Sequence, residues 1–128
     1  MIRGVAETVL YADDLVAAAR FYANVLGLAV VRQPDDLMAV VRVNPTSVVL
    51  LFNHRSSAVP SRNVPSHGTV GPGHVAFLVD KLEAWRERLR AAGVPIEREI
   101  DWPRGGRSIY VRDPANNSVE LMDRDIWP

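Results

Sequence analysis

The sequence predicts an α+β fold in which a βαβββ unit occurs twice. When residues 7–27 are aligned with residues 74–93, both segments open with a strand pattern and continue with an Asp, a helical pattern and a Gly. Asp13 lies six residues after Glu7, and Asp80 lies six residues after His74. The closing Gly27 lies twenty residues after Glu7, and the closing Gly93 lies nineteen residues after His74. Three short strand-like runs then follow each glycine. Because the same features recur in the same order, we interpret them as an internal repeat.

The first unit begins with an alternating strand over Val5–Tyr11 and continues with a helix over Asp14–Leu26. Asp13 or Asp14 is expected to cap this helix, and Gly27 stands where a left-handed closing residue is needed. The apolar face that this helix turns to a sheet consists of Ala18, Phe21, Tyr22 and Val25. The three strands that follow are expected over Leu28–Arg32, Leu37–Val43 and Ser47–Phe52.

The second unit repeats this plan with a strand that begins at His74 and a helix over Lys81–Ala92. Asp80 and Glu83 have the spacing of a capping box, and Gly93 closes the helix. Its apolar face consists of Leu82, Trp85, Leu89 and Ala92. The last three strands are expected over Ile96–Ile100, Ser108–Arg112 and Ser118–Met122.

A segment rich in Ser, Pro and Gly separates the two units. We therefore divide the chain into a first unit (1–53), a connector (54–72) and a second unit (73–128), which together form one domain.

Composition limits the functions that this chain can have. With 128 residues, 48% of them apolar and 23% charged, it can bury a core. It has no cysteine, which excludes disulfides, thiolate zinc sites and a cysteine nucleophile. Balanced charge (15 basic and 15 acidic residues) argues against general nucleic-acid binding. The longest aliphatic and aromatic run, Val48–Phe52, is too short to span a membrane, so we expect a cytoplasmic protein with a small-molecule partner.

Strand alternation brings three polar side chains onto the face that the helices do not cover. Apolar residues alternate along the strands that contain His74 and Glu120, which turns these two side chains away from the helix layer, and Glu7 has the matching position in the first unit. Two carboxylates and an imidazole can bind a divalent metal ion. The alternative is structural: Glu7 and His74 pair with each other across the cavity.

Three segments resemble the vicinal oxygen chelate superfamily, which includes glyoxalases, bleomycin and fosfomycin resistance proteins, epimerases and ring-cleaving dioxygenases. They are "ETVLYADDLVAAARFYANVLGL", "GPGHVAFLVD" and "GRSIYVRDPANNSVELMD". The resemblance covers nearly the whole chain. It implies that each mixed sheet curls into a cleft, that two units enclose one cavity, and that Glu7, His74 and Glu120 bind the metal.

The resemblance further implies a glyoxalase-like, metal-dependent lyase or isomerase/epimerase. Its substrate would be small and would chelate the metal (Zn, Ni, Mn, Co or Fe(II)) through adjacent oxygens. Glu120 or Glu7 would move a proton alpha to a carbonyl.

Two departures from the family pattern narrow this expectation. Glu7 replaces the usual first-strand His, which disfavours a ring-cleaving dioxygenase. Val49 or Leu50 stands where glyoxalase I has a further Glu, which argues against glyoxalase I activity itself. The alternative function is metal-free drug binding of the bleomycin resistance type, with Trp102 and Trp127 as stacking surfaces and Trp85 in the core.

Four further side chains are candidates for substrate binding. Arg107 could pair with an anionic group or lie on the surface, and Trp102 could form an apolar wall. Tyr11 shares the strand face of Glu7, and His67 could cover the cavity from the connector or lie exposed in it.

Family members of this length are commonly homodimers in which the first unit of one chain pairs with the second unit of the other. We therefore expect a homodimer whose sites combine Glu7 of one chain with His74 and Glu120 of its partner, and the connector is long enough to allow this exchange.

Overall fold

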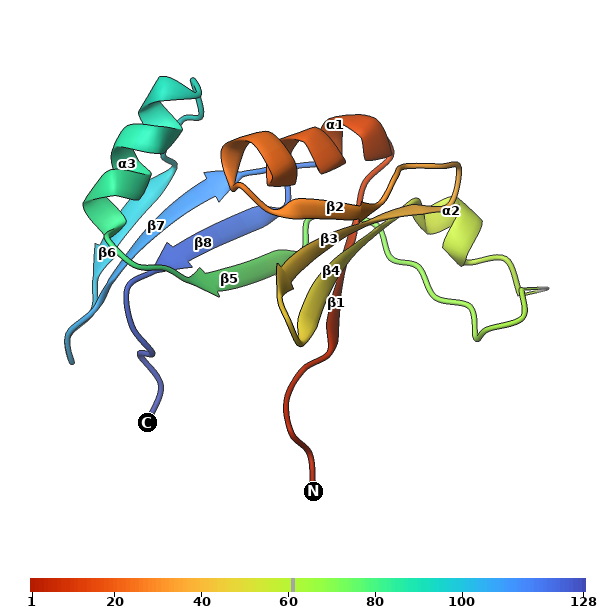
Figure 1. The fold of residues 1–128 in the computed structure, drawn as a ribbon, viewed down its shortest axis with the longest axis horizontal. Coiled ribbons are helices and arrows are strands. Elements are labelled where there is room, and N and C mark those ends of the chain that lie inside the picture. Colours follow the sequence, from red (N-terminus) through yellow and green to blue (C-terminus); the bar gives the residue numbers. More distant parts are fainter. Residues whose placement is uncertain (61) are drawn as a thin grey trace.

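The computed structural model describes residues 1–60 and 62–128 and contains the two expected βαβββ units (Figure 1). Each unit forms a four-stranded mixed sheet with the order β1-β4-β3-β2 or β5-β8-β7-β6, and in each sheet the first and last strands of the unit pair in parallel. The first unit consists of β1 (Glu7–Tyr11), α1 (Leu15–Arg20), the π-helical turn η1 (Phe21–Val25), β2 (Ala29–Arg32), β3 (Met38–Asn44) and β4 (Ser47–Phe52). The second consists of β5 (His74–Leu78), α3 (Leu82–Ala91), β6 (Arg98–Asp101), β7 (Arg107–Arg112) and β8 (Ser118–Met122).

The helix ends agree with the sequence except at one cap. Asp14 caps α1 by accepting a hydrogen bond from the Ala17 amide at 2.9 Å. Gly27 and Gly93 have φ of +76° and +70°, as expected for closing residues. The predicted capping box of Asp80 and Glu83 is wrong. The N-cap of α3 is Lys81, which has a left-handed backbone conformation and makes no side-chain capping hydrogen bond. Glu83 instead forms ion pairs with Arg86 of the same helix and with Arg107 of β7, which engage its carboxylate.

Helices α1 and α3 lie on one side of the two sheets, and the chain termini extend from the other side (Figure 1). Alternate strand residues accordingly lie in the core beneath the helices, where Tyr22, Leu89 and strand residues such as Val41, Ile109 and Leu121 are at most 1% exposed. The predicted helix faces are confirmed apart from Ala92, which is exposed beyond the end of α3. The uncovered side of each sheet is called the open face below. Among the described residues, no helix has the length and apolarity needed to cross a membrane.

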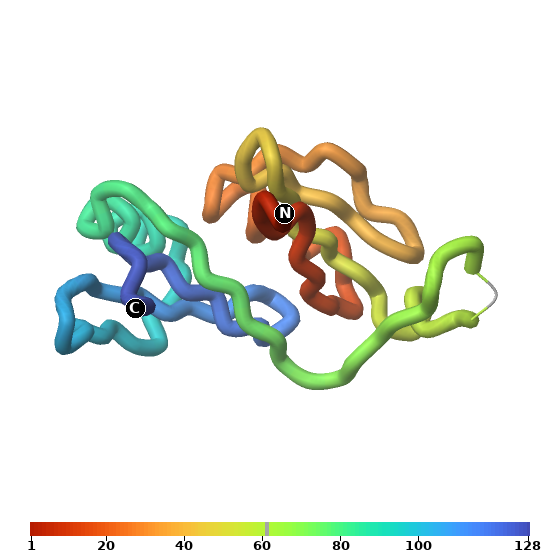
Figure 2. Tube along the Cα trace, turned by 90° about the horizontal axis from the view of Figure 1, so that it is seen from below, coloured from red at the N-terminus to blue at the C-terminus, as the bar shows by residue number. Residues whose placement is uncertain are grey.

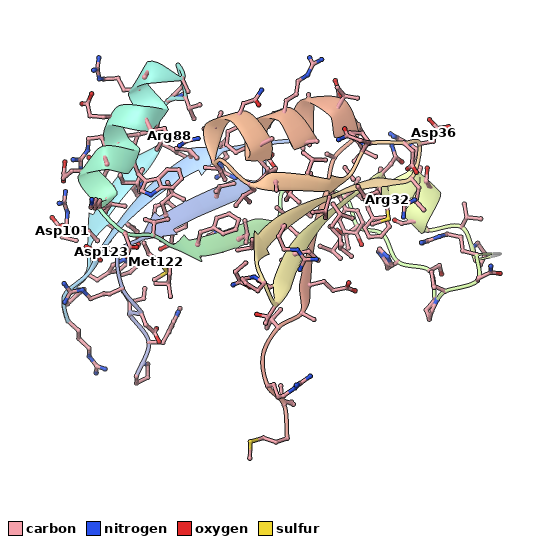
Figure 3. All side chains as sticks on the ribbon, in the orientation of Figure 1. Arg32, Asp36, Arg88, Asp101, Met122 and Asp123 are labelled. Carbon is pink, nitrogen blue, oxygen red and sulfur yellow. The ribbon has the colours of Figure 1, made fainter. Side chains whose placement is uncertain are left out.

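A buried polar joint fixes the two units side by side (Figure 2). The Asn117 side chain accepts from the Gly73 amide at 2.7 Å and donates to the Tyr11 carbonyl at 3.0 Å. The Tyr22 hydroxyl donates to Asp113 at 2.8 Å, and burial together with this carboxylate raises the pKa of Tyr22 far above its usual value. Nearer the solvent, Arg88 of α3 reaches the Val25 carbonyl of the first unit at 2.6 Å (Figure 3).

Replacing Asn117 with Ala should destabilise the protein by about 2–4 kcal/mol, because the Gly73 amide and the Tyr11 carbonyl lose partly buried hydrogen bonds and the Asn117 side chain that is removed is only 1% exposed. Urea unfolding followed by circular dichroism measures this cost. Asn63→Ala in the exposed connector is the matched control and should change stability by less than about 0.5 kcal/mol. Equal effects of the two substitutions would show that the joint does not stabilise the fold.

Candidate metal site on the open face

His74 and Glu120 lie together on the open face of the second sheet. Their strands β5 and β8 are parallel neighbours, and the register pairs His74 with Ser118 and Ala76 with Glu120. His74 Nε2 lies 3.3 Å from Glu120 Oε2. The His74 side chain is half exposed, whereas that of Glu120 is only 7% exposed. The strand alternation predicted from the sequence is therefore confirmed for these two residues.

Hydrogen bonding fixes the orientation of the His74 ring. Nδ1 lies 3.2 Å from the Ser118 carbonyl oxygen, which can only accept a hydrogen bond, so Nδ1 carries a proton. The ring also stacks on Tyr110, with centroids 6.3 Å apart and planes at 22°. Nε2 therefore faces Glu120 Oε2, and it is the ring nitrogen that could coordinate a cation at this site.

Glu120 is held from the neighbouring strand β7. The Ser108 hydroxyl donates to Glu120 Oε1 at 2.5 Å, and the Trp102 indole donates to Ser108 Oγ at 2.8 Å. Burial and the nearby Glu120 carboxylate raise the pKa of Tyr110. Ser108 and Tyr110 were missed as site residues from the sequence. Their alternation with the fully buried Ile109 and Val111 is the signal that places them on the open face.

Glu7 lies apart from this pair within the chain. It is exposed at the start of β1, opposite Val48 of β4, in the first unit. Over residues 1–60 and 62–128, three acidic, His or Cys side chains never gather closely enough to hold a metal ion together. One chain therefore brings together two of the three expected ligands.

The connector places His67 over the open face of the first unit. His67 Nδ1 lies 2.7 Å from the Tyr11 hydroxyl, and its ring meets Phe52 edge-on with centroids 4.6 Å apart. The Arg62 guanidinium lies over the Phe52 ring, 5.7 Å from its centroid. The structure thus brings together Tyr11 and His67, two candidates for substrate binding. His67 is half-buried in this position.

Arg107 lies on the helix-covered side of the sheet rather than with Glu120. It forms ion pairs with Glu83 of α3 at 2.8 Å and with Asp101 of β6 at 3.2 Å, and Glu83 raises the pKa of Arg107. This position supports the surface interpretation of Arg107, and its proposed contact with a substrate anion gains no support. On the open face, the register instead pairs Tyr110 with Arg98.

The tryptophans differ in their surroundings. Trp85 packs against the core, as expected. The Arg88 guanidinium carbon lies over its ring, 5.3 Å from the ring centroid. Trp102 is bound to Ser108, and Trp127 is 76% exposed near the C-terminus.

Comparison with known proteins agrees with the fold of two βαβββ units. The family model described as Glyoxalase/Bleomycin resistance protein/Dioxygenase superfamily matches residues 4–121. The chain belongs to this superfamily. A lactoylglutathione lyase from Agrobacterium tumefaciens has a similar structure, with a TM-score of 0.90 and 38% identity over 94% of this chain and 93% of that one.

Two sequence relatives represent different members of the superfamily. The lactoylglutathione lyase of Salmonella typhimurium is 28% identical over 91% of this chain and 90% of its own length. The biphenyl-2,3-diol 1,2-dioxygenase 3 of Rhodococcus globerulus is 30% identical over 91% of this chain. This chain spans 61% of the length of that dioxygenase.

The structure distinguishes between the two positions considered for the further glutamate of the superfamily's glyoxalase I. Val49 is 1% exposed and packs in the core, whereas Leu50 pairs with Val9 and lies on the open face with Glu7. The open-face position on β4 is therefore apolar in this chain.

Proposed function

We propose that this superfamily member is a metal-dependent lyase or isomerase that acts on a small substrate with two adjacent oxygens. The observation that carries the proposal is the His74–Glu120 pair, with Nε2 and Oε2 3.3 Å apart on an open face and each residue fixed by a further hydrogen bond. The lactoylglutathione lyases among its relatives support the same type of reaction.

The donor set fits a divalent cation. His74 offers Nε2 because its Nδ1 is engaged by a backbone carbonyl, which is the usual arrangement of a metal-binding histidine. Glu120 is a buried carboxylate, and a nearby cation offsets the cost of burying its charge. Glu7 would add a second carboxylate, and the resulting site suits Zn, Mn, Co, Ni or Fe(II). A bound divalent ion would polarise a carbonyl and stabilise the negative charge that develops on its oxygen.

The two glutamates suit different roles. Glu120 is held by Ser108 and is almost fully buried, which suits a fixed ligand. Glu7 is exposed at a strand end, which gives it the freedom to take a proton from the carbon alpha to the substrate carbonyl and return it. Tyr11 and His67 lie on the same face as Glu7 and would contact the substrate.

We further propose that the site is completed in a homodimer. The buried joint at Asn117 and Tyr22 holds the two units of one chain side by side, with Glu7 away from His74. Strands β1 and β5 are both sheet edges, so each can approach a second chain. Two chains can then place Glu7 of one subunit beside His74 and Glu120 of the other.

An adjacent-oxygen chelator tests the proposed chemistry without knowledge of the natural substrate. Acetohydroxamate should bind to Zn²⁺-loaded protein and show at least tenfold weaker binding to chelator-treated protein in calorimetry, because its two oxygens need the metal. Equal binding to both forms would favour the metal-free alternative. A panel of thiol hemithioacetals and 2-oxo acids, followed by NMR in D₂O for exchange of the alpha proton, then identifies the substrate class.

A further inference from the structure

We propose that Trp102 and Ser108 form a positioning relay that holds Glu120 in one orientation, with Oε1 engaged and Oε2 directed to the site. This inference rests on the proposed function, because it concerns the ligand role of Glu120. Neither Trp102 nor Ser108 would touch the metal or the substrate through this relay. Their effect would pass through the Glu120 carboxylate.

The relay has a fixed direction. An indole N–H can donate a hydrogen bond but never accept one, so Trp102 Nε1 must donate to Ser108 Oγ over their 2.8 Å contact. Ser108 has a single hydroxyl proton, and it lies between its oxygen and Glu120 Oε1 at 2.5 Å. Because the indole engages Ser108 Oγ as an acceptor, the serine proton is left to bind Oε1, and Oε2 is the oxygen that lies near His74 Nε2.

Because Ser108 and Glu120 are buried, water cannot easily replace the hydrogen bond between them. Ser108 is 1% exposed and Glu120 is 6% exposed, so water has little access to a carboxylate oxygen that loses its partner. A hydrogen bond from a neutral hydroxyl to an ionised carboxylate is also shorter and stronger than one between neutral groups. Rotation of Glu120 would therefore leave a buried carboxylate without its hydrogen bond from Ser108.

A glycine turn brings Trp102 back to Ser108. The Trp102 amide donates to the Gly106 carbonyl at 2.9 Å, and the Gly105 amide donates to the Trp102 carbonyl at 3.0 Å. Gly105 and Gly106 have φ of +94° and +97°, which residues with a Cβ rarely adopt. A Cβ at Gly106 would also lie 2.8 Å from Arg124 Cγ. The residues between β6 and β7 therefore form a turn that aims the indole at the site.

Metal titration of full-length relay variants tests the proposal. With Zn²⁺ and a competing chromophoric chelator, Ser108→Ala should weaken binding by about 10–100-fold, as is typical when the partner of a metal ligand is removed. Trp102→Phe should weaken it by about threefold or more, because Ser108 can then turn its proton away from Glu120. Ser108→Thr keeps the hydroxyl and should stay within about threefold of the parent.

Tryptophan fluorescence adds a readout that a purely structural role would not change. Metal binding should alter the emission of the parent and of Trp85→Phe, the matched control in the core, and should leave the emission of Trp102→Phe nearly constant. If Ser108→Ala fails to fold by circular dichroism, the affinity and emission of Trp102→Phe decide the question.

Unchanged affinity in Ser108→Ala, or a full emission change in Trp102→Phe, would overturn the relay while the metal site itself stands. If the parent binds no divalent ion, the proposed function fails, and the relay fails with it. A loss of affinity in Ser108→Thr as large as that in Ser108→Ala would also contradict the relay, since the hydroxyl would then have no special role.

Discussion

Replacing His74 with Ala should reduce divalent metal affinity by at least about 100-fold, because it removes the only neutral nitrogen donor of the proposed site. Glu7→Gln and Glu120→Gln should each also reduce metal content sharply, since an amide keeps the shape of the side chain and loses its charge. Metal content is measured by elemental analysis after equilibrium dialysis against Zn²⁺, Mn²⁺ and Ni²⁺. We expect one ion per chain for the parent.

Matched controls exist on surfaces away from the site. The controls are His54→Ala in the short connector helix α2 (His54–Ser57) and Glu87→Gln on the exposed side of α3. Both control variants should keep full metal content. If His74→Ala, Glu7→Gln and Glu120→Gln all retain metal, the site lies elsewhere. A loss in His54→Ala as large as that in His74→Ala would indicate that the ion binds nonspecifically to histidines of this chain.

Subunit exchange should restore metal sites in a mixture of two variants that are each defective. Glu7→Gln and His74→Ala are prepared separately, shown not to bind metal, and then unfolded and refolded together in equal amounts. In an exchanged dimer, half of the randomly paired dimers are mixed, and each has one intact site and one doubly defective site. About a quarter of the parental sites should therefore return.

A dimer in which each chain builds its own site gives the opposite result. Every site then carries one defect, so no metal binding returns even when mixed dimers are present. Native mass spectrometry measures the fraction of mixed dimers, so that an absence of exchange during refolding is distinguished from an absence of shared sites. Recovery close to zero with mixed dimers present would contradict the shared site and leave the ligand assignment standing.

The fold could be predicted because its signals are local. Alternation in the strands and apolar spacing in the helices depend on neighbouring residues, and the repeat presented each signal twice. The cap of α3 was mispredicted because Asp80 and Glu83 have suitable spacing but Glu83 pairs with Arg86 and with Arg107 of β7. Helix α2 was also missed: it begins after Asn53, which accepts hydrogen bonds from Arg55 and Ser56 within a segment interpreted as connector.

The candidate site was only partly predictable, because its remaining contacts join distant residues. Strand alternation predicts which face of the sheet carries His74 and Glu120. Ser108 and Trp102 join this site only because β7 lies beside β8 in the folded sheet. Arg107 follows the strand alternation of Ile109, which turns it to the helix side, and its neighbouring glycines had suggested a cavity position. The joint between the units links residues such as Tyr22 and Asp113, which are 91 positions apart. No local pattern reports such a contact.

In the proposed dimer, His74 and Glu120 of one chain bind a divalent ion together with a glutamate from a second chain. Anomalous diffraction at the zinc edge, from crystals grown with Zn²⁺, locates this ion. We expect one peak per chain at about 2.0–2.2 Å from His74 Nε2, from Glu120 Oε2 and from a carboxylate oxygen of Glu7 of the partner subunit. A peak away from His74 and Glu120, or a peak at these residues with Glu7 of the same chain, would contradict it.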